Sequence, residues 1–129
     1  MNDPELLPAE LAAKSLSDCE IVLAYDDVIG AIKHLASSGY FVMSWEGWLK
    51  YPDGGIIHSI HQETRGFRGI KGPPVDQGKS VEQRINEAAL FAQETIKESQ
   101  REWNNAPEII GGTLYFCLSI ETPSAKGQD

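Results

Sequence analysis

The feature that most constrains the fold of this chain is a long helical pattern that begins at Ser80. Gln83 follows Ser80 at the spacing of a capping box, which is typical of a helix start. Apolar residues then recur on one side of a helix that would end near Asn104: Ile85, Ala88, Ala89, Ala92, Ile96 and Trp103. At about 1.5 Å per residue, this helix would be roughly 37 Å long. A helix of that length in a small domain must lie across a sheet and cover it.

Strand patterns supply the sheet. Residues 113–120 alternate, with Leu114, Phe116, Leu118 and Ile120 on one face, which predicts a half-buried strand. Residues 40–51 are rich in aromatic and other apolar side chains and predict a second strand. The short apolar segment at residues 20–25 fits either a strand or an extended connector.

A hairpin is expected after residue 51, because Pro52-Asp53-Gly54-Gly55 is a strong turn signal. The partner strand would run from Ile56 to His61. A tip centred on Asp53 and Gly54 would place Tyr51 opposite Ile56 and Glu46 opposite His61.

Two shorter helices are predicted before the sheet. Asp3 and Pro4 resemble a helix cap with proline in the first turn, for a helix that ends near Lys14. Asp26 would cap a second helix that Gly39 terminates. Its core-facing stripe would be Val28, Ala31, Ile32 and Leu35.

These elements predict an α+β fold, with a mostly antiparallel sheet of three to four strands packed against one long helix and one or two shorter helices. The 129 residues suit a single domain spanning residues 1–129. Residues 62–79 are rich in glycine and proline and predict a long loop, and residues 121–129 predict a flexible tail.

The net charge of −8 limits the classes of partner. Binding to nucleic acid or to an anionic membrane requires clustered basic side chains, so neither is expected as a direct partner. Residues 1–63 contain ten acidic and three basic residues, a balance of −7. This half of the chain provides either a solvated surface or a surface that attracts a basic partner.

The cellular setting follows from what the sequence lacks. Two cysteines are too few for a disulfide scaffold, and their spacing fits no zinc site. Neither a signal peptide nor an apolar run long enough to span a bilayer is found. A cytoplasmic protein without a cofactor is expected.

The histidines and arginines around the hairpin suggest weak candidate sites. His58 and His61 are three residues apart, and in a strand such side chains point to opposite faces, so no metal site is expected. Glu46 facing His61 would form a cross-strand pair, which is also the minimum for acid–base chemistry. Arg65 and Arg68, in the glycine-rich loop, could hold an anion.

Trp45, Glu46 and Trp48 form the densest unusual cluster in the sequence. The two tryptophans should point to opposite faces of the strand. One of them would then be an exposed binding anchor, or both would be covered by helical layers.

The segment from Glu20 to Gly55 combines several of these features. An apolar lead-in precedes the helix at Asp26-Asp27-Val28-Ile29-Gly30-Ala31-Ile32, and a strand then runs into Ser44-Trp45-Glu46-Gly47-Trp48 and a Pro-Asp-Gly turn. This segment resembles small bacterial immunity proteins of polymorphic-toxin systems, in particular the family numbered forty among them. Ser44-Trp45-Glu46 stands where that family has a Gly-Gly-Asp-aromatic segment.

The resemblance implies a non-enzymatic protein that binds and neutralises a cognate toxin through an acidic surface, and a basic, nuclease-like toxin is the expected partner. The partner-binding residues would then be drawn from Asp26, Asp27, Trp45, Glu46, Trp48 and Asp53. One alternative is a small enzyme or ligand-binding domain, in which Glu46 and His61 supply acid–base groups while Arg65 or Arg68 binds an anionic ligand. Another is a structural or oligomeric domain whose second half mediates self-association. The oligomeric state is open.

Overall fold

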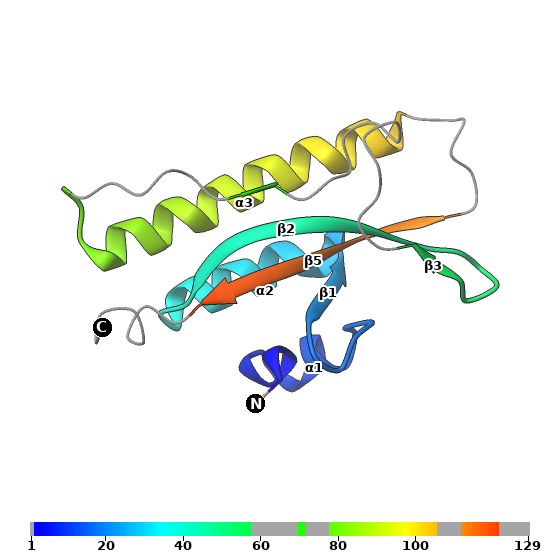
Figure 1. The fold of residues 1–129 in the computed structure, drawn as a ribbon, viewed down its shortest axis with the longest axis horizontal. Coiled ribbons are helices and arrows are strands. Elements are labelled where there is room, and N and C mark those ends of the chain that lie inside the picture. The colour runs from blue at the N-terminus through cyan, green and yellow to red at the C-terminus, as the bar shows by residue number, and fades with distance from the viewer. Residues whose placement is uncertain (1, 58–69, 72–77, 106–111, 122–129) are drawn as a thin grey trace.

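The structure is a computed structural model of the chain, and it describes residues 2–57, 70–71, 78–105 and 112–121. In chain order its elements are η1 (Asp3–Leu6), α1 (Ala9–Ala12), β1 (Ile21–Ala24), α2 (Tyr25–Ser37), β2 (Phe41–Lys50), β3 (Ile56–Ile57), β4 (Ile70–Lys71), α3 (Val81–Asn104) and β5 (Thr113–Glu121). The predicted α+β fold is confirmed, with an antiparallel sheet packed against one long helix and shorter ones (Figure 1).

The described strands pair in the order β1-β5-β2-β3, and β4 also pairs with β2. β5 lies between β1 and β2 and is antiparallel to both. The strands β1 and β2 therefore run in the same direction, and α2 connects them past β5. Across the three strands, Val22 lies opposite Cys117, and Cys117 lies opposite Glu46. Val22, Cys117 and Glu46 therefore form one row across the three strands.

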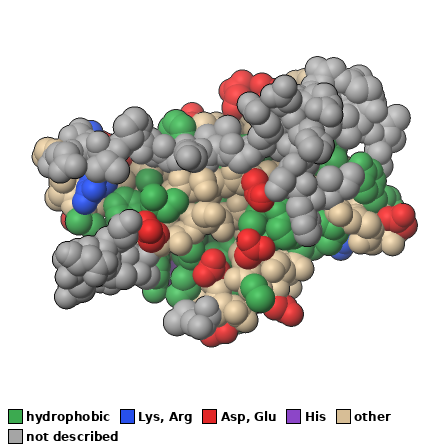
Figure 2. Space-filling view, viewed as in Figure 1, with side chains coloured by type: hydrophobic (Ala, Val, Ile, Leu, Met, Phe, Trp, Pro, Cys, Tyr) green, Lys and Arg blue, Asp and Glu red, His purple; other side chains and the backbone are tan. Residues whose placement is uncertain are grey.

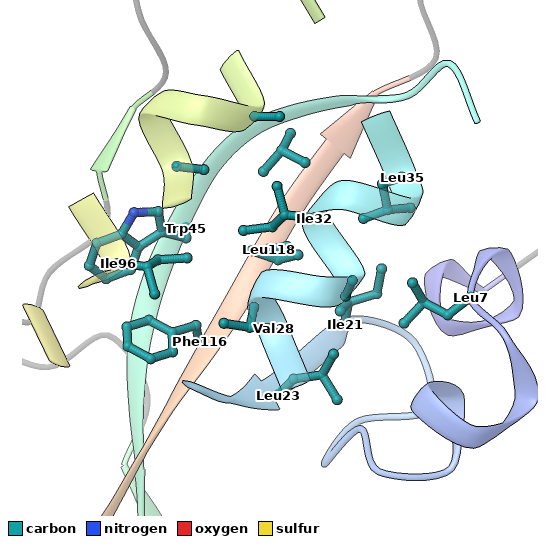
Figure 3. Close-up of a cluster of buried hydrophobic side chains, with 14 of the residues drawn as sticks. Leu7, Ile21, Leu23, Val28, Ile32, Leu35, Trp45, Ile96, Phe116 and Leu118 are labelled. Atoms are coloured by element: carbon teal, nitrogen blue, oxygen red, sulfur yellow. The ribbon is translucent and has the colours of Figure 1, made fainter. Parts of the chain in front are cut away.

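One face of the sheet is covered by α2 and α3. The four predicted core positions of α2, from Val28 to Leu35, are fully buried. They pack with buried side chains of α3 and with alternate residues of all three long strands, as Figure 3 shows. Leu7 of the N-terminal segment joins the same core. The apolar periodicity of the sequence correctly identified this face.

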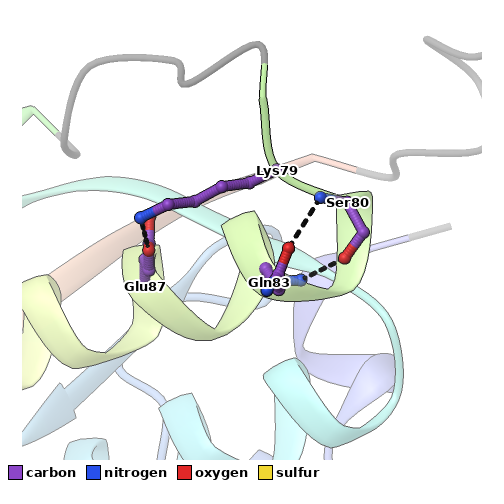
Figure 4. Close-up of polar contacts among 4 residues, drawn as sticks. All are labelled: Lys79, Ser80, Gln83 and Glu87. Carbon is purple, nitrogen blue, oxygen red and sulfur yellow. Dashed lines mark hydrogen bonds and ion pairs between the residues drawn. The ribbon is translucent and has the colours of Figure 1, made fainter.

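The start of α3 has the predicted capping box. The Ser80 hydroxyl accepts a hydrogen bond from the Gln83 amide at 3.1 Å, and the Gln83 side chain accepts one from the Ser80 amide at 2.9 Å (Figure 4). Lys79 forms an ion pair with Glu87 one turn further along. The capping box satisfies the backbone amides of Ser80 and Gln83, which would otherwise lack intrahelical partners.

The N-terminal helix differs from its prediction. The structure has two short helices, η1 and α1, and the N-cap of η1 is Asn2 and not Asp3. Leu7 between them is extended, with φ −101° and ψ 158°. Pro8 explains the break, because proline disfavours the helical conformation of the residue before it.

The second helix begins two residues earlier than predicted, at Tyr25. Its N-cap is Ala24, which has no capping side chain, so the expectation that Asp26 caps the helix is wrong. Asp26 lies in the first turn, where a negative charge is still favoured by the helix dipole. Gly39 follows the helix with φ 92°, a conformation that favours glycine, as the prediction of a glycine terminator requires.

The hairpin forms, but its predicted register is wrong by one residue. Ile56 pairs with Lys50 and not with Tyr51. The Tyr51 and Gly55 backbones are joined by a hydrogen bond of 2.8 Å, which encloses a loop centred on Asp53 alone. The Asp53 carboxylate accepts the Gly55 amide at 2.8 Å, and Gly54 has φ 93°. These local bonds favour the longer loop over the two-residue turn.

The loop predicted at residues 62–79 contains one element that the sequence did not indicate. Ile70–Lys71 forms β4, which pairs with Ser44 and Trp45 of β2. Most of the remaining loop lies outside the described residues. The tail predicted at residues 121–129 begins one residue too early, because Glu121 is the last residue of β5, and residues 122–129 lie outside the described residues.

Candidate functional site

The two candidate tryptophans point to opposite faces of β2, as predicted, and both are buried. Trp45 is 2% exposed and lies in the core beneath the helices. Trp48 is 7% exposed and packs on the other face with Val22 and Cys117, beside Leu16. The expectation of an exposed aromatic anchor is therefore wrong, and the alternative that both are covered is the one observed. Among the described residues, the partly buried side chains that pack on this face are Leu16 of the N-terminal segment and Tyr115 of β5, and neither belongs to a helix.

The position of Trp45 is fixed by specific contacts in addition to burial. Its Nε1 donates to the Thr95 hydroxyl of α3 at 2.8 Å. Its ring meets that of Phe116 edge to face, with centroids 5.2 Å apart and an angle of 75°. Figure 3 shows Ile96 against the same indole. Trp45 therefore joins the sheet to α3 and is not available to a partner.

The candidate aspartates occupy three different settings. Asp26 is exposed in the first turn of α2. Asp27 is partly buried, and its Oδ1 forms an ion pair with the Lys14 Nζ at 3.2 Å. Asp53 is exposed at the hairpin tip, where it shapes the loop. Asp26 is the least engaged of the three in local structure.

A more coherent group of acidic side chains lies on the sheet face opposite the helices. Glu46 of β2 is half-buried directly across from Cys117 of β5. The Cys117 thiol donates to a carboxylate oxygen of Glu20 at 3.6 Å, a weak sulfur hydrogen bond. Asp3 of η1 is tied to the same region, because its backbone amide donates to the Cys19 carbonyl at 3.2 Å. We call Asp3, Glu20 and Glu46 around Cys117 the acidic face.

Glu20 lies close enough to Asp3 and to Cys117 to affect the pKa of both groups. Burial and the nearby Glu20 charge raise the pKa of the Asp3 carboxyl. Burial, followed by the charges of Glu20 and Glu46, raises the pKa of the Cys117 thiol strongly. Cys117 therefore remains a protonated thiol at neutral pH, which argues against a nucleophilic role.

Two of these carboxylates, Asp3 and Glu20, take part in none of the ion pairs among the described residues. Those ion pairs are Lys14–Asp27, Lys79–Glu87 and Arg101–Glu98. Figure 2, seen from the side where β2 and β5 pass in front of α2, shows Asp and Glu side chains over the strands and the N-terminal segment. Lys and Arg side chains are visible there only toward the ends of the molecule.

The described part of the chain does not support metal binding, acid–base catalysis or anion binding. No group of three or more His, Cys, Asp or Glu side chains there could hold a metal ion. His58, His61, Arg65 and Arg68, which the acid–base and anion-binding hypotheses require, lie outside the described residues. Of the helices that the structure describes, none is long and apolar enough to cross a membrane.

Sequence reasoning missed Asp3, Glu20 and Cys117 as members of one site. Asp3 and Glu20 were counted in the acidic excess, but no local pattern brings them to Glu46. The missing information was the register in which β5 lies between β1 and β2.

No protein-family model, curated protein or solved structure matches the chain. The function therefore has to be argued from the acidic face itself.

Proposed function

We propose that this chain is a non-enzymatic immunity protein that binds and neutralises a cognate bacterial toxin through an acidic surface. The observation that carries the proposal is the convergence of Asp3, Glu20 and Glu46 on one sheet face, where the pKa of Asp3 is raised by burial and by the Glu20 charge. A protein holds like charges together at a cost, which a basic partner would relieve on binding. The resemblance of residues 20–55 to immunity proteins agrees with this use of the surface.

The partner is proposed to be a basic protein, such as a toxin that attacks nucleic acid. Basic enzymes of that kind attract acidic inhibitors over long range, which raises the association rate. We place the complex in the cytoplasm, where such a toxin would reach its target. Binding would rest on charge, because both tryptophans of β2 are buried.

The test uses the toxin encoded beside the gene. The purified chain should bind this toxin and protect cells that express it, and absence of both binding and protection refutes the proposal. The association rate should fall steeply as salt is raised, because screening at about 8 Å in physiological salt weakens long-range attraction between charges.

Charge reversals locate the surface. Glu20→Lys should lower the association rate at low salt by about tenfold or more. Glu94→Lys is the matched control, because it makes the same change of charge at an exposed position on α3. Asp26→Lys tests the start of α2 in the same way. If Glu20→Lys binds as the unmodified chain does while Asp26→Lys loses binding, the partner-binding surface is at α2 and not at the acidic face.

A further inference from the structure

The outer edge of β1 is covered by a short turn of the N-terminal segment. Among the described strands β1 pairs with β5 alone, so its other edge faces residues 15–20. The Val22 amide donates to the Ser15 hydroxyl at 3.0 Å, and the Val22 carbonyl accepts the Leu16 amide at 3.0 Å. We call residues 15–20 the edge cover. Both backbone groups that Val22 directs away from β5 are satisfied by it.

The edge cover is a structured turn. The Ser15 hydroxyl lies 2.8 Å from the Glu20 carbonyl and 2.9 Å from that of Ser17, so it donates within the turn while it accepts from Val22. The Ser17 hydroxyl accepts the amides of Cys19 and Glu20, each at 3.1 Å. The Leu16 side chain packs beside Trp48 and Val22 on the sheet face. The Ser15 hydroxyl therefore donates within the turn and also accepts from the edge of β1, which joins the turn to the strand.

The strand beneath has no protection of its own. Exposed edges are usually guarded by lysine, proline, a bulge or a covering loop, because unpaired backbone groups recruit other strands. β1 reads Ile21-Val22-Leu23-Ala24, and its pairing with β5 shows no register shift. Of these guards, β1 has only the covering loop.

We propose that the edge cover keeps the chain monomeric and that, when it lifts, β1 pairs with β1 of a second copy. Two antiparallel copies related by a twofold axis would bring Val22 opposite Val22. Each Val22 amide would then donate to the other copy's Val22 carbonyl, which replaces the two hydrogen bonds lost from Ser15 and Leu16. A second copy fits this edge because the same residue supplies both halves of the pairing. This inference is independent of the proposed toxin-binding function.

The experiment opens the edge in the full chain. The double variant Ser15→Ala, Leu16→Pro removes the acceptor and the donor that satisfy Val22, whereas the control Leu16→Ala loses the leucine packing but keeps both backbone bonds. Light scattering should show the double variant rising toward twice the monomer mass with concentration, while the control and the unmodified chain stay monomeric. Exchange of the Val22 amide in the double variant should be fast in dilute solution and slow in concentrated solution. A folded double variant that stays monomeric, or that dimerises without protecting the Val22 amide, overturns the proposal.

The single variant Ser15→Ala decides the matter if the double variant does not fold. It keeps the Leu16 amide, but removes the acceptor for the Val22 amide and the donor to the Ser17 and Glu20 carbonyls, so the edge cover should lift more readily. The Val22 amide should then exchange about tenfold or more faster than in the unmodified dilute protein, and it should slow again as protein concentration rises. Fast exchange that does not depend on concentration would refute pairing with a second copy.

Discussion

The hydrogen bond between Trp45 and Thr95 gives the most direct test of how the sheet is attached to α3. The Thr95 hydroxyl accepts the indole N–H at 2.8 Å and lies 2.9 Å from the Phe91 carbonyl, to which it donates. Thr95→Val keeps the shape of the side chain and removes the acceptor. Trp45 is 2% exposed, so water does not reach the indole to replace the bond. The buried N–H left without a partner should lower the free energy of unfolding by about 1–3 kcal/mol.

Urea unfolding followed by circular dichroism measures this loss. The matched control is Thr95→Ser, which keeps the hydroxyl and removes one methyl group, at a cost of about 0.8 kcal/mol if that group is fully buried. In a Trp45→Phe background, where no N–H remains to be satisfied, Thr95→Val should cost close to nothing. The coupling in this double-mutant cycle should therefore be about 1–3 kcal/mol. A valine variant as stable as the parent chain, or one equally destabilised in both backgrounds, would refute the reasoning.

Three further outcomes are expected. Ser80→Ala removes the cap of α3 and should lower the free energy of unfolding by about 1 kcal/mol, measured by urea denaturation, whereas an unchanged midpoint would mean that the cap is not needed. A chromogenic thiol reagent at neutral pH should modify the exposed Cys19 in the folded chain and Cys117 only after unfolding, because burial and the Glu20 charge raise the pKa of the Cys117 thiol; rapid reaction of both would contradict this. The pKa of the Asp3 carboxyl is higher in the folded chain than in the unfolded chain. The contribution of Asp3 to the free energy of unfolding should therefore fall as the pH rises from the unfolded-state pKa to the folded-state pKa, because over this range unfolding releases the Asp3 proton. The free energy of unfolding of Asp3→Asn, relative to that of the parent chain, should therefore be higher at pH about 7 than at pH about 3. A difference between the two chains that does not change with pH would contradict a raised pKa of Asp3 in the folded state.

Elements with a clear period were predictable from the sequence, because burial of one face requires the pattern that the sequence shows. The stripe of α2 and the alternation of β5 gave their elements and their buried sides, and the Ser80 cap gave the start of α3. The failures occurred where a few local bonds compete on nearly equal terms. Pro8 divided the N-terminal helix, and the Asp53 carboxylate favoured a longer hairpin loop than the turn signal alone indicated.

The candidate site was less predictable than the fold, since it depends on contacts distant in sequence. Glu20 meets Cys117 only because β1 pairs with β5, and Glu46 joins them only because β2 pairs with the other side of β5. No residue near Glu20 in the sequence indicates either pairing. The acidic excess of the first half of the chain was a correct statement of composition, but it did not say which carboxylates share a face.

The burial of both tryptophans determines what kind of interface the acidic face can be. Interfaces that rely on aromatic anchors gain most of their affinity from a slow dissociation rate, because a buried side chain must leave its pocket. Trp45 and Trp48 are committed to the two sides of β2, so the acidic face lacks an anchor from this pair and presents carboxylates over a covered apolar centre. Charges of this kind act mainly on the association rate and its dependence on salt. Substitutions at Glu20 should therefore change the association rate of a basic partner far more than its dissociation rate. If dissociation proved to be the step that changes, Glu20 would have to form a buried, hydrogen-bonded charge pair with the partner and not an exposed one.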